Sequence, residues 1–520
     1  MEAETSGRET LPEVFRWQRP DPITAMSTES PESPTPVQSW IQQMRNWVSL
    51  SGLVTVLASL FAFLLLFLLD TIARSSNPYV GVLTYLVAPA FSTIGVGLVL
   101  LGMVLQRRKL VRARGRPVRL VIDLSQRRDR RILGFFVAGS VAFLFITAIG
   151  SYHSYQFTES VTFCGRTCHT VMKPEAVRYE HSPHARVTCA ECHIGPGAQW
   201  FVKAKISGLH QVYASAFDTF PRPVPTPIKN LRPAQDTCEH CHWPQRFSGD
   251  MVRTYRHYLS DATNTEYTVR MMLRVGGSDP RRGPVSGIHW HTSQENKVEY
   301  LATDNLRLKI PWVRLTDGQG VVTEFRSPGF TNAVEPAAIR TMDCIDCHNR
   351  PSHRYEKPNE AVDLAIALGR ISPALTSIRS NATVVLTQPY ATEAEALQKI
   401  ASTLDGLYPG DPRIKPAVEA VQQIYLNNFF PEMKASWKDY PEHIGHKDWP
   451  GCARCHDDQH KSSDGQRTIG FRDCNSCHVL VAQGQGAALD QLTPSGQEFK
   501  HPGEDYDPEF KCYDCHTGGP

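Results

Sequence analysis

Residues 189–193 read Cys189-Ala-Glu-Cys192-His193, and this short pattern recurs along the chain. In every copy, two cysteines separated by two or three residues are followed directly by a histidine. All fourteen cysteines of the 520-residue chain fall within such copies, so none is left over for a disulfide framework. In chain order, the seven clusters are Cys164/Cys168/His169, Cys189/Cys192/His193, Cys238/Cys241/His242, Cys344/Cys347/His348, Cys452/Cys455/His456, Cys474/Cys477/His478 and Cys512/Cys515/His516.

A Cys-x-x-Cys-His cluster is the attachment signature of haem c, in which two thiols capture the haem vinyl groups and the histidine binds the iron. Structural zinc is the main alternative, because Cys-x-x-Cys pairs also build zinc sites. A zinc site needs four ligands and therefore usually two such pairs, whereas here each single pair carries its own histidine. We therefore expect seven covalently attached haems, the first on a cluster with three residues between Cys164 and Cys168.

Three uncharged apolar stretches precede the clusters, at about residues 47–69, 79–105 and 132–151. Each is long enough to cross a hydrocarbon core of about 30 Å as a helix. Eleven arginines and lysines run from Arg107 to Arg131, whereas the loop between the first two stretches carries only Arg74. The positive-inside rule then predicts a cytoplasmic N-terminus and a periplasmic region after the third span. Buried helices of a soluble domain, and nucleic-acid binding by the basic loop, are alternatives that this topology makes unnecessary.

The chain divides into five parts. Residues 1–40 are rich in Ser, Thr, Pro and Glu, which predicts a disordered cytoplasmic N-terminus. A three-helix transmembrane region follows at 41–152. The periplasmic part comprises a tetrahaem module at 153–355 with a β insertion at about 251–335, a helical linker at 356–445 and a trihaem module at 446–520.

The predicted fold is a membrane-anchored multihaem cytochrome c with three transmembrane helices and a haem-packed, mainly helical and loop periplasmic domain with a small β insertion. This domain carries about one haem per fifty residues, so we expect haem, rather than an ordinary apolar core, to fill its interior. Alternating residues at 265–275 and 306–315, with a Gly-rich turn before 321–325, predict strands. Helices are predicted at 359–371, after the capping box of Thr392 and Glu395, and at 415–430.

Four stretches resemble the NapC/NirT family of membrane quinol dehydrogenases: 163–172 (FCGRTCHTVM), 182–189 (SPHARVTC), 192–197 (CHIGPG) and 344–353 (CIDCHNRPSH). The resemblance covers about 130–355 apart from the β insertion. With three spans and three further clusters, the whole chain is most similar to the seven-haem ImcH-like inner-membrane cytochromes.

This resemblance implies a multi-pass protein of the bacterial inner membrane whose haem domain faces the periplasm. It implies a quinol:cytochrome c-type oxidoreductase that passes electrons from the quinol pool to periplasmic c-type cytochromes or a periplasmic reductase, in anaerobic or extracellular respiration. The family also forms dimers, so a homo-oligomer stays open.

Thirteen histidines lie outside the cluster positions, enough for a second histidine on every iron, an arrangement that suits electron transfer. The resemblance implies that His184 pairs with His348 and that His353 pairs with His193. It also implies Met172 as a ligand of the first haem. A surface histidine, or a methionine that only packs against the haem, is the alternative in each case.

For the third haem, His257, His289 and His291 stay open as partners of His242. The last two alternate along an expected strand, so only one of them should face a given haem. The C-terminal haems are expected to take their second ligands from three nearby histidines, His446, His460 and His501, without assignment to particular clusters. Three others are interpreted as surface residues, namely His181, His240 and His443.

Quinol must lose two protons as it delivers two electrons, so a base is needed where it is oxidised. The resemblance implies polar residues after the second cluster, and the candidates are Lys203, Lys205 and His210. Lysines near a membrane also bind lipid headgroups, which is their alternative interpretation.

Two other functions stay open. A multihaem reductase of a small nitrogen or sulfur oxyanion needs an open iron position, often on a Cys-x-x-Cys-Lys cluster, and the sequence contains no such cluster. An electron-relay subunit of a larger membrane complex would use the three spans for docking and have no quinol site.

Overall fold

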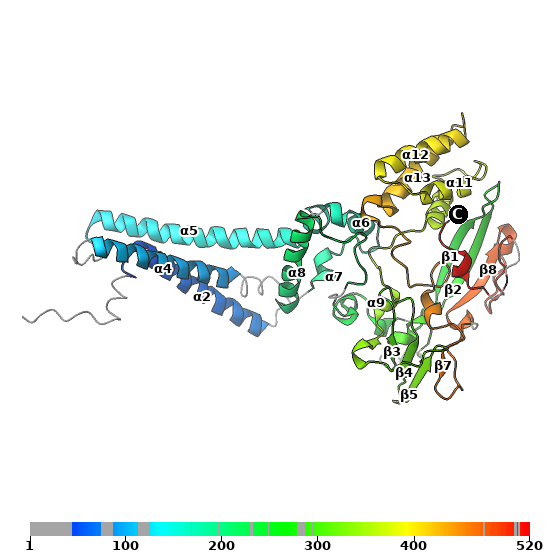
Figure 1. The fold of residues 1–520 in the computed structure, drawn as a ribbon, viewed down its shortest axis with the longest axis horizontal. Helices are drawn as coiled ribbons and strands as arrows, with labels where there is room; N and C mark the ends of the chain where they lie inside the picture. Colours follow the sequence, from blue (N-terminus) through cyan, green and yellow to red (C-terminus); the bar gives the residue numbers. More distant parts are fainter. Residues whose placement is uncertain are drawn as a thin grey trace, which may run out of the picture. The chain divides into compact units, whose positions relative to one another are not determined.

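The computed structural model of this chain describes residues 44–73, 87–112, 124–167, 169–195, 198–228, 232–247, 249–277, 286–293, 295–471, 474–503, 507 and 510–519. The chain separates into two compact units, one with residues up to 62 and 88–141, the other with residues 63–87 and 142–520. We refer to them as the helical unit and the haem unit (Figure 1). The N-terminal segment expected to be disordered, 1–40, lies outside the described residues.

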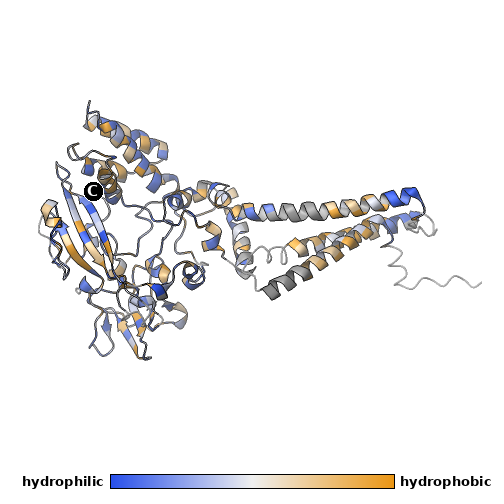
Figure 2. Cartoon of the chain, turned by 180° about the vertical axis from the view of Figure 1, so that it is seen from behind, coloured by the Kyte–Doolittle hydropathy of each residue, from blue (hydrophilic) through white to orange (hydrophobic). Residues whose placement is uncertain are grey.

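The helical unit contains α2 (Trp47–Ala73), α4 (Ala88–Arg112) and the beginning of α5 (Arg127–Thr158). Residues 47–64 in α2 and 88–109 in α4 are long and apolar enough to cross a membrane, each with a mean hydropathy of 2.0 (Figure 2). The third expected span falls within α5, where many side chains lie outside the described part of the chain. That third span stays a prediction.

Small residues form the contact between α2 and α4. A Cβ atom added at Gly52 would lie 2.6 Å from the carbonyl oxygen of Gly95, so no larger residue fits there. The Ser49 hydroxyl donates to the carbonyl oxygen of Val99 at 3.2 Å, and the Ser59 hydroxyl donates to that of Ala88. Close approach through small residues and polar bonds between helices is typical of membrane bundles.

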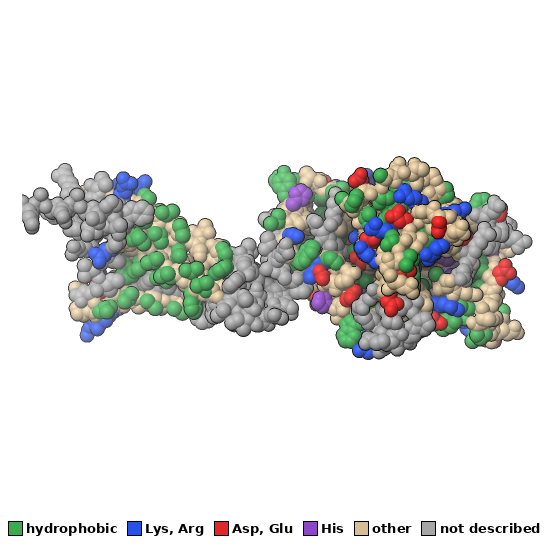
Figure 3. All heavy atoms as spheres, turned by 90° about the horizontal axis from the view of Figure 1, so that it is seen from below, with side chains coloured by type: hydrophobic (Ala, Val, Ile, Leu, Met, Phe, Trp, Pro, Cys, Tyr) green, Lys and Arg blue, Asp and Glu red, His purple; other side chains and the backbone are tan. Residues whose placement is uncertain are grey.

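The outer surfaces of α2 and α4 remain apolar. Large hydrophobic side chains are exposed along both helices, among them Leu57, Phe61, Leu100 and Leu101 (Figure 3). A soluble protein rarely exposes a contiguous apolar surface of this kind, whereas lipid would cover it. This surface agrees with membrane insertion of the two helices.

Two antiparallel sheets lie in the haem unit. The first has the order β1-β2-β8, with β1 at Met251–Tyr258, β2 at Glu266–Leu273 and β8 at His478–Gly484. The second has the order β6-β3-β4-β5-β7, with strands at Arg340–Thr341, Lys297–Leu301, Trp312–Thr316, Val322–Arg326 and Lys461–Ser462.

The predicted hairpin is confirmed, because β4 pairs with β5 across the turn at Asp317. The predicted strand at 265–275 is confirmed as β2, which pairs with β1 along its length. Strands β7 and β8, however, come from the C-terminal region and close the outer edges of the two sheets. The β insertion is therefore not a separate structure of residues 251–335.

The helical linker folds as α10 (Pro358–Ala367), α11 (Ile378–Thr387), α12 (Glu393–Leu407) and α13 (Ile414–Asn428). Helix α12 begins as predicted, with the Thr392 side chain accepting a hydrogen bond from the amide of Glu395 at 3.2 Å. Helix α11 was not predicted.

The expectation that haem replaces an ordinary apolar core is wrong for this linker. Its helices bury a continuous apolar cluster that includes Val362, Ile378, Leu386, Ile400 and Val421. About ninety residues without a haem cluster are long enough to bury their own amphipathic faces, so they need no porphyrin for packing.

Candidate haem centres

Each described cluster lies on a short helical turn. In the third, fourth, fifth and seventh clusters, the histidine amide donates to the carbonyl oxygen of the first cysteine, for example His348 to Cys344 at 2.8 Å. Residues three apart on a helix lie on one face, so the turn presents both thiols in the same direction. Two thioether bonds to one planar ring need this arrangement.

The cluster thiols differ in their burial. Burial raises the pKa of Cys347 and Cys455 to about 12. By exposed surface, Cys241, Cys452, Cys512 and Cys515 are exposed, and the other described cluster cysteines, Cys347, Cys455 and Cys477 among them, are half-buried. A domain with so many clusters has too little chain to cover all of them, so some must lie near the surface. Haem attachment at every cluster stays a prediction from the spacing of its residues.

An acidic residue directly before the second cysteine caps three of these turns. The side chains of Glu191, Asp346 and Asp514 accept hydrogen bonds from the backbone amides that start the turn, at 2.6–2.8 Å. These carboxylates satisfy amides that have no partner within the helix. The pattern Cys-x-Asp/Glu-Cys-His marks these caps in the sequence, and the predictions above did not use that signal.

The first cluster absorbs its extra residue in a π-helical turn, Phe163–Thr167. A π turn is wider than an α turn and holds one more residue, and such turns are frequent at functional sites. The departure of the first cluster from the usual spacing therefore has a local structural explanation. Cys168 and the side chains of His169 and Cys474 lie outside the described residues.

Each of the six cluster histidines whose side chain the structure describes faces a second histidine ring. The ring centroids lie 5.8–6.4 Å apart in the pairs His193/His353, His242/His184, His348/His289, His456/His291, His478/His446 and His516/His501. Two imidazoles that bind one metal ion from opposite sides, with bonds of about 2 Å, would have centroids about 6.4 Å apart. The spacing of every pair thus fits an iron atom between the rings.

Burial keeps several of these imidazoles neutral. It lowers the pKa of His193, His353, His348, His446 and His478 below the ordinary value of 6.5. A protonated imidazole has no lone pair for a metal, so burial favours the ligating form. The donor set and its protonation both fit haem iron.

The pairing differs from the expectation in one respect. The structure brings His353 to His193, as the resemblance implied, but His184 faces His242 and not His348. The ring that faces His348 is His289, at 6.4 Å and nearly parallel. His184 therefore serves the third cluster in place of the fourth.

His289 and His291 each face a different cluster histidine, so only one faces a given cluster, as expected, but neither faces His242, for which they were candidates. They lie on the 3-10 turn η7 (Ile288–Thr292) and not on a strand. Successive residues of a 3-10 helix point in directions about 120° apart, so two residues at this spacing reach different haems. One turn supplies rings to the fourth and fifth clusters.

His460 does not fit the predicted ligand role. Its Nδ1 atom lies 2.9 Å from the Asp457 carboxylate and its Nε2 atom lies 2.7 Å from the carbonyl oxygen of Ile310. Both nitrogens are thus engaged by protein oxygens, which leaves no lone pair for iron. His443, interpreted as a surface residue, is instead buried, with its ring nitrogens near the carbonyl oxygens of Asp346 and Leu306. Met172 lies on α6 (His169–Glu180), and its ligation of the first haem stays a prediction.

Each of the first four clusters lies near the next one in space, in the same order as along the chain. The Cys164 thiol hydrogen-bonds that of Cys189 and lowers the pKa of Cys189 to about 7. Burial raises the pKa of Cys238 to about 11, and the nearby Cys344 and Cys192 add to the effect. Electron transfer between haems requires such short separations.

A buried polar network joins the fourth and fifth clusters. Arg454, within the fifth cluster, donates to the carbonyl oxygen of Asp346, within the fourth, at 2.9 Å. The buried Asp346 carboxylate accepts hydrogen bonds from three side chains, Tyr300, Arg307 and Arg340. A buried carboxylate with this many partners holds its neighbours in one geometry.

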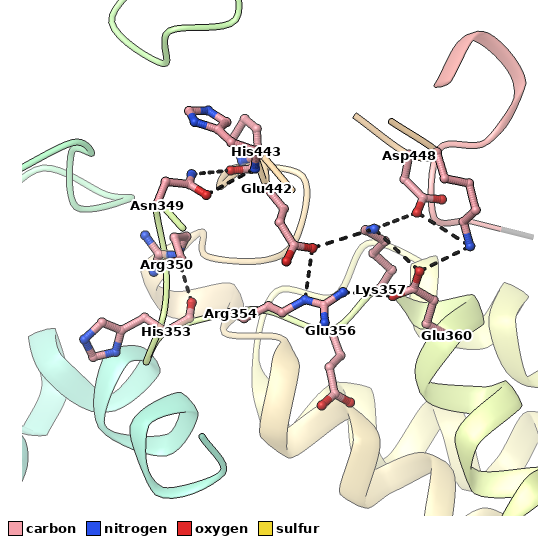
Figure 4. A network of polar contacts seen from close by, with 12 residues as sticks. Asn349, Arg350, His353, Arg354, Glu356, Lys357, Glu360, Glu442, His443 and Asp448 are labelled. Carbon is pink, nitrogen blue, oxygen red and sulfur yellow. Dashed lines mark hydrogen bonds and ion pairs between the residues drawn. The ribbon is translucent and has the colours of Figure 1, made fainter. Parts of the chain in front are cut away.

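A second ion network borders the seventh cluster (Figure 4). Lys357 contacts Asp448 at 2.6 Å, and Arg354 contacts Glu442 at 2.9 Å. Burial opposes ionisation of Glu360, but Lys357, Lys447 and Arg354 outweigh it and lower the pKa of Glu360 to about 2. The chain end packs against this region, because the Trp437 indole donates to the carbonyl oxygen of Thr517 at 3.0 Å.

The candidates for the quinol site lie on α8 (Ala198–Ala216), directly after the second cluster. Lys203 and His210 are exposed and lie seven residues apart, two turns along one helix face. The Lys203 ammonium lies 4.8 Å from the ring centroid of Trp200. The side chain of Lys205 lies outside the described residues.

Exposed apolar side chains share this face of α8. Ile206 lies between Lys203 and His210, and Tyr213 lies one turn after His210. Phe217 follows the end of the helix, and its ring centroid lies 4.7 Å from that of Tyr213. The three side chains are each more than half exposed, at 64%, 58% and 65%. Base and apolar surface thus occur together on one face, which here is named the α8 face.

Comparisons with known proteins agree with this architecture. Residues 126–224 match the N-terminal region of the NapC/NirT cytochrome c family. The chain is 40% identical over 490 residues to the cytochrome c-type protein ImcH of Geobacter sulfurreducens. The aligned residues make up 91% of this chain and 95% of that protein. No solved structure matches the chain.

Proposed function

Because this chain belongs to the NapC/NirT cytochrome c family and is a multihaem membrane cytochrome of electron transport, we propose that it oxidises membrane quinol. It would carry seven covalently attached haems and pass electrons to a periplasmic acceptor. Haem c, when bound, supplies iron that accepts and releases single electrons. The residues of this chain would hold the haems and take up the protons of the quinol.

The paired histidines support a relay of electrons and not reduction of a small oxyanion. Six clusters have a second imidazole at a spacing that fits iron, so these centres offer no open position for substrate. Cysteines of successive clusters, from the first to the fifth, lie near enough to affect one another's pKa, which supports a continuous route for electrons between them.

The α8 face is the observation that carries the quinol proposal. An apolar quinone ring and tail need exposed apolar surface, which Ile206, Tyr213 and Phe217 provide. Oxidation releases two protons, and His210 on the same face is placed to accept one of them. Helix α8 follows the second cluster, whose Cys189 contacts Cys164 of the first. Lys203 would orient a quinol oxygen or accept the other proton.

The test is stopped-flow absorbance at the haem α-band after mixing the detergent-purified full chain with a reduced menaquinone analogue. His210→Gln should slow quinol-driven reduction by roughly 100-fold or more, since a positioned base contributes about that much to proton transfer. Reduction of the same variant by dithionite should be unchanged. The control is Lys399→Gln, which alters an exposed basic residue on α12 and should leave both rates as they were.

Haem content is measured on the same samples. A pyridine haemochrome assay should give seven haems per chain in the unaltered protein and in both variants. If quinol fails to reduce a chain with all its haems while dithionite succeeds, the protein has no quinol site and acts as a relay subunit. A His210→Gln rate equal to that of the unaltered chain would instead remove His210 from the mechanism.

A further inference from the structure

The histidine pairs differ in what their second ring nitrogen contacts. In the pairs with described Nδ1 contacts, this atom donates to a backbone carbonyl oxygen at 2.9–3.3 Å. The donors and acceptors are His353 to Glu175, His184 to Pro351, His289 to Val275, His291 to Ile288 and His456 to Gly470. With Nδ1 engaged in this way, Nε2 is the nitrogen of each ring that remains for iron.

The pair His446/His478 lacks such bonds. The Nδ1 atoms of both rings are buried and have no hydrogen-bond partner among the described residues. A phenyl ring covers His446, because the Phe471 centroid lies 5.1 Å from it, and the Lys511 ammonium lies 4.3 Å from that phenyl ring. Within the described part of the chain, this centre therefore makes no hydrogen bond from either Nδ1 atom and has a cation nearby.

Hydrogen bonding at Nδ1 controls the electron density that an imidazole gives to iron. A ring that donates its Nδ1 proton to an oxygen becomes a stronger base, which stabilises ferric iron and lowers the reduction potential. A ring without an acceptor gives less stabilisation to the ferric state. A nearby cation acts in the same direction, because reduction removes one positive charge from the centre.

We propose that the haem held by His446 and His478 has a more positive reduction potential than the four haems whose histidines donate from Nδ1. This haem would collect the electrons that reach the C-terminal region. It would therefore hold them last, before they pass to the acceptor. The difference in reduction potential should be largest relative to the haem held by His456 and His291, because both of these rings donate from Nδ1. This inference rests on the haem content in the proposed function but not on quinol oxidation.

The test is a potentiometric titration of the full chain with redox mediators, followed by low-temperature electron paramagnetic resonance of ferric haem. Ferric signals depend on the angle between the two imidazole planes, which is 24° for His446/His478 and 80° for His291/His456. His446→Met should replace one signal of the oxidised protein, and His291→Met, the matched control, should replace another. Each variant thereby assigns a signal in the unaltered chain.

In the unaltered chain, the signal assigned by His446→Met should disappear before that assigned by His291→Met as the potential is lowered. The reverse order, or joint disappearance, overturns the proposal. If His446→Met lowers the haem content, Lys511→Met serves instead, since it changes no ligand. It should move one transition, which lies above that assigned by His291→Met, to a more negative potential, and a titration without any shifted transition would equally overturn the proposal. Quinol plays no part in this titration, so its outcome is independent of the stopped-flow result.

Discussion

Glu360 is held ionised at a position where burial alone would favour its protonated form. Lys357, Lys447 and Arg354 surround it, and its pKa falls from 4.5 to about 2. A carboxyl group whose pKa is lowered on folding stabilises the protein at pH values above its unfolded pKa. This stabilisation is lost as the pH falls from about 4.5 to about 2.

Glu360→Gln should therefore lower stability at neutral pH, by up to about 3 kcal/mol from a shift of this size. The difference from the unaltered chain should shrink as the pH falls through this window and vanish near its lower end. Thermal unfolding followed by far-ultraviolet circular dichroism at several pH values measures it. Glu419→Gln, on the exposed side of α13, is the control and should change little. A pH-independent difference would contradict the account.

At the scale of elements, the η7 turn shows how local geometry assigns ligands. Alternation in the sequence predicts a strand here, on which His289 and His291 would compete for one haem. In the structure the segment turns, and Trp290 between them packs against the buried cluster of the second sheet. The anchored turn directs the two imidazoles to different clusters.

His289→Met should consequently change the ligand of one haem, that attached at His348, and leave the haem at His456 as it was. Resonance Raman and paramagnetic resonance spectra should show one His/His centre replaced by a His/Met centre, with haem content unchanged. His181→Met is the control, because His181 is exposed and its Nδ1 contacts the carbonyl oxygen of Val177. An unaltered spectrum in the His289 variant would exclude this ligand assignment.

Helix α8 is the second element whose role depends on its surface. Its basic and apolar residues look ordinary in a sequence, since lysine and isoleucine alternate in many surface helices. Only their exposure on one face, next to the second cluster, makes them a candidate site for an apolar substrate that releases protons.

At the scale of the whole molecule, the C-terminal region is interleaved with the rest of the haem unit. Strands β7 and β8 complete sheets begun by residues 251–326, and His291 faces the fifth cluster from outside that region. The trihaem module at 446–520 would therefore be incomplete by itself.

Residues 446–520 produced alone with covalently attached haem should contain one high-spin ferric haem, at His456, because its second imidazole is missing. The remaining two haems have partners within the segment, His446 and His501, and should be low-spin if it keeps its fold. Paramagnetic resonance distinguishes the two spin states. The full chain, in which His291 is present, is the comparison. Three low-spin haems in the isolated segment would contradict the assignment.

Local sequence is enough to predict two apolar helices and much of the secondary structure, and it is also the basis of the expected haem attachment points. A cluster needs only a few adjacent residues, and a span needs only a run of apolar ones. The hairpin around Asp317 and the start of α12 at Thr392 are equally local and equally predictable. The exposure of Cys241 and Cys515 is not, because it depends on which segments pack over each cluster.

Which histidine faces which cluster depends on the tertiary structure. His184, His289 and His291 lie 58, 59 and 165 residues from the histidines that they face, so no spacing rule could connect them. His460 lies close to its cluster in sequence, yet Asp457 and Ile310 take both of its nitrogens. A ligand pair depends on two side chains meeting at a fixed distance, and chain folding sets that distance.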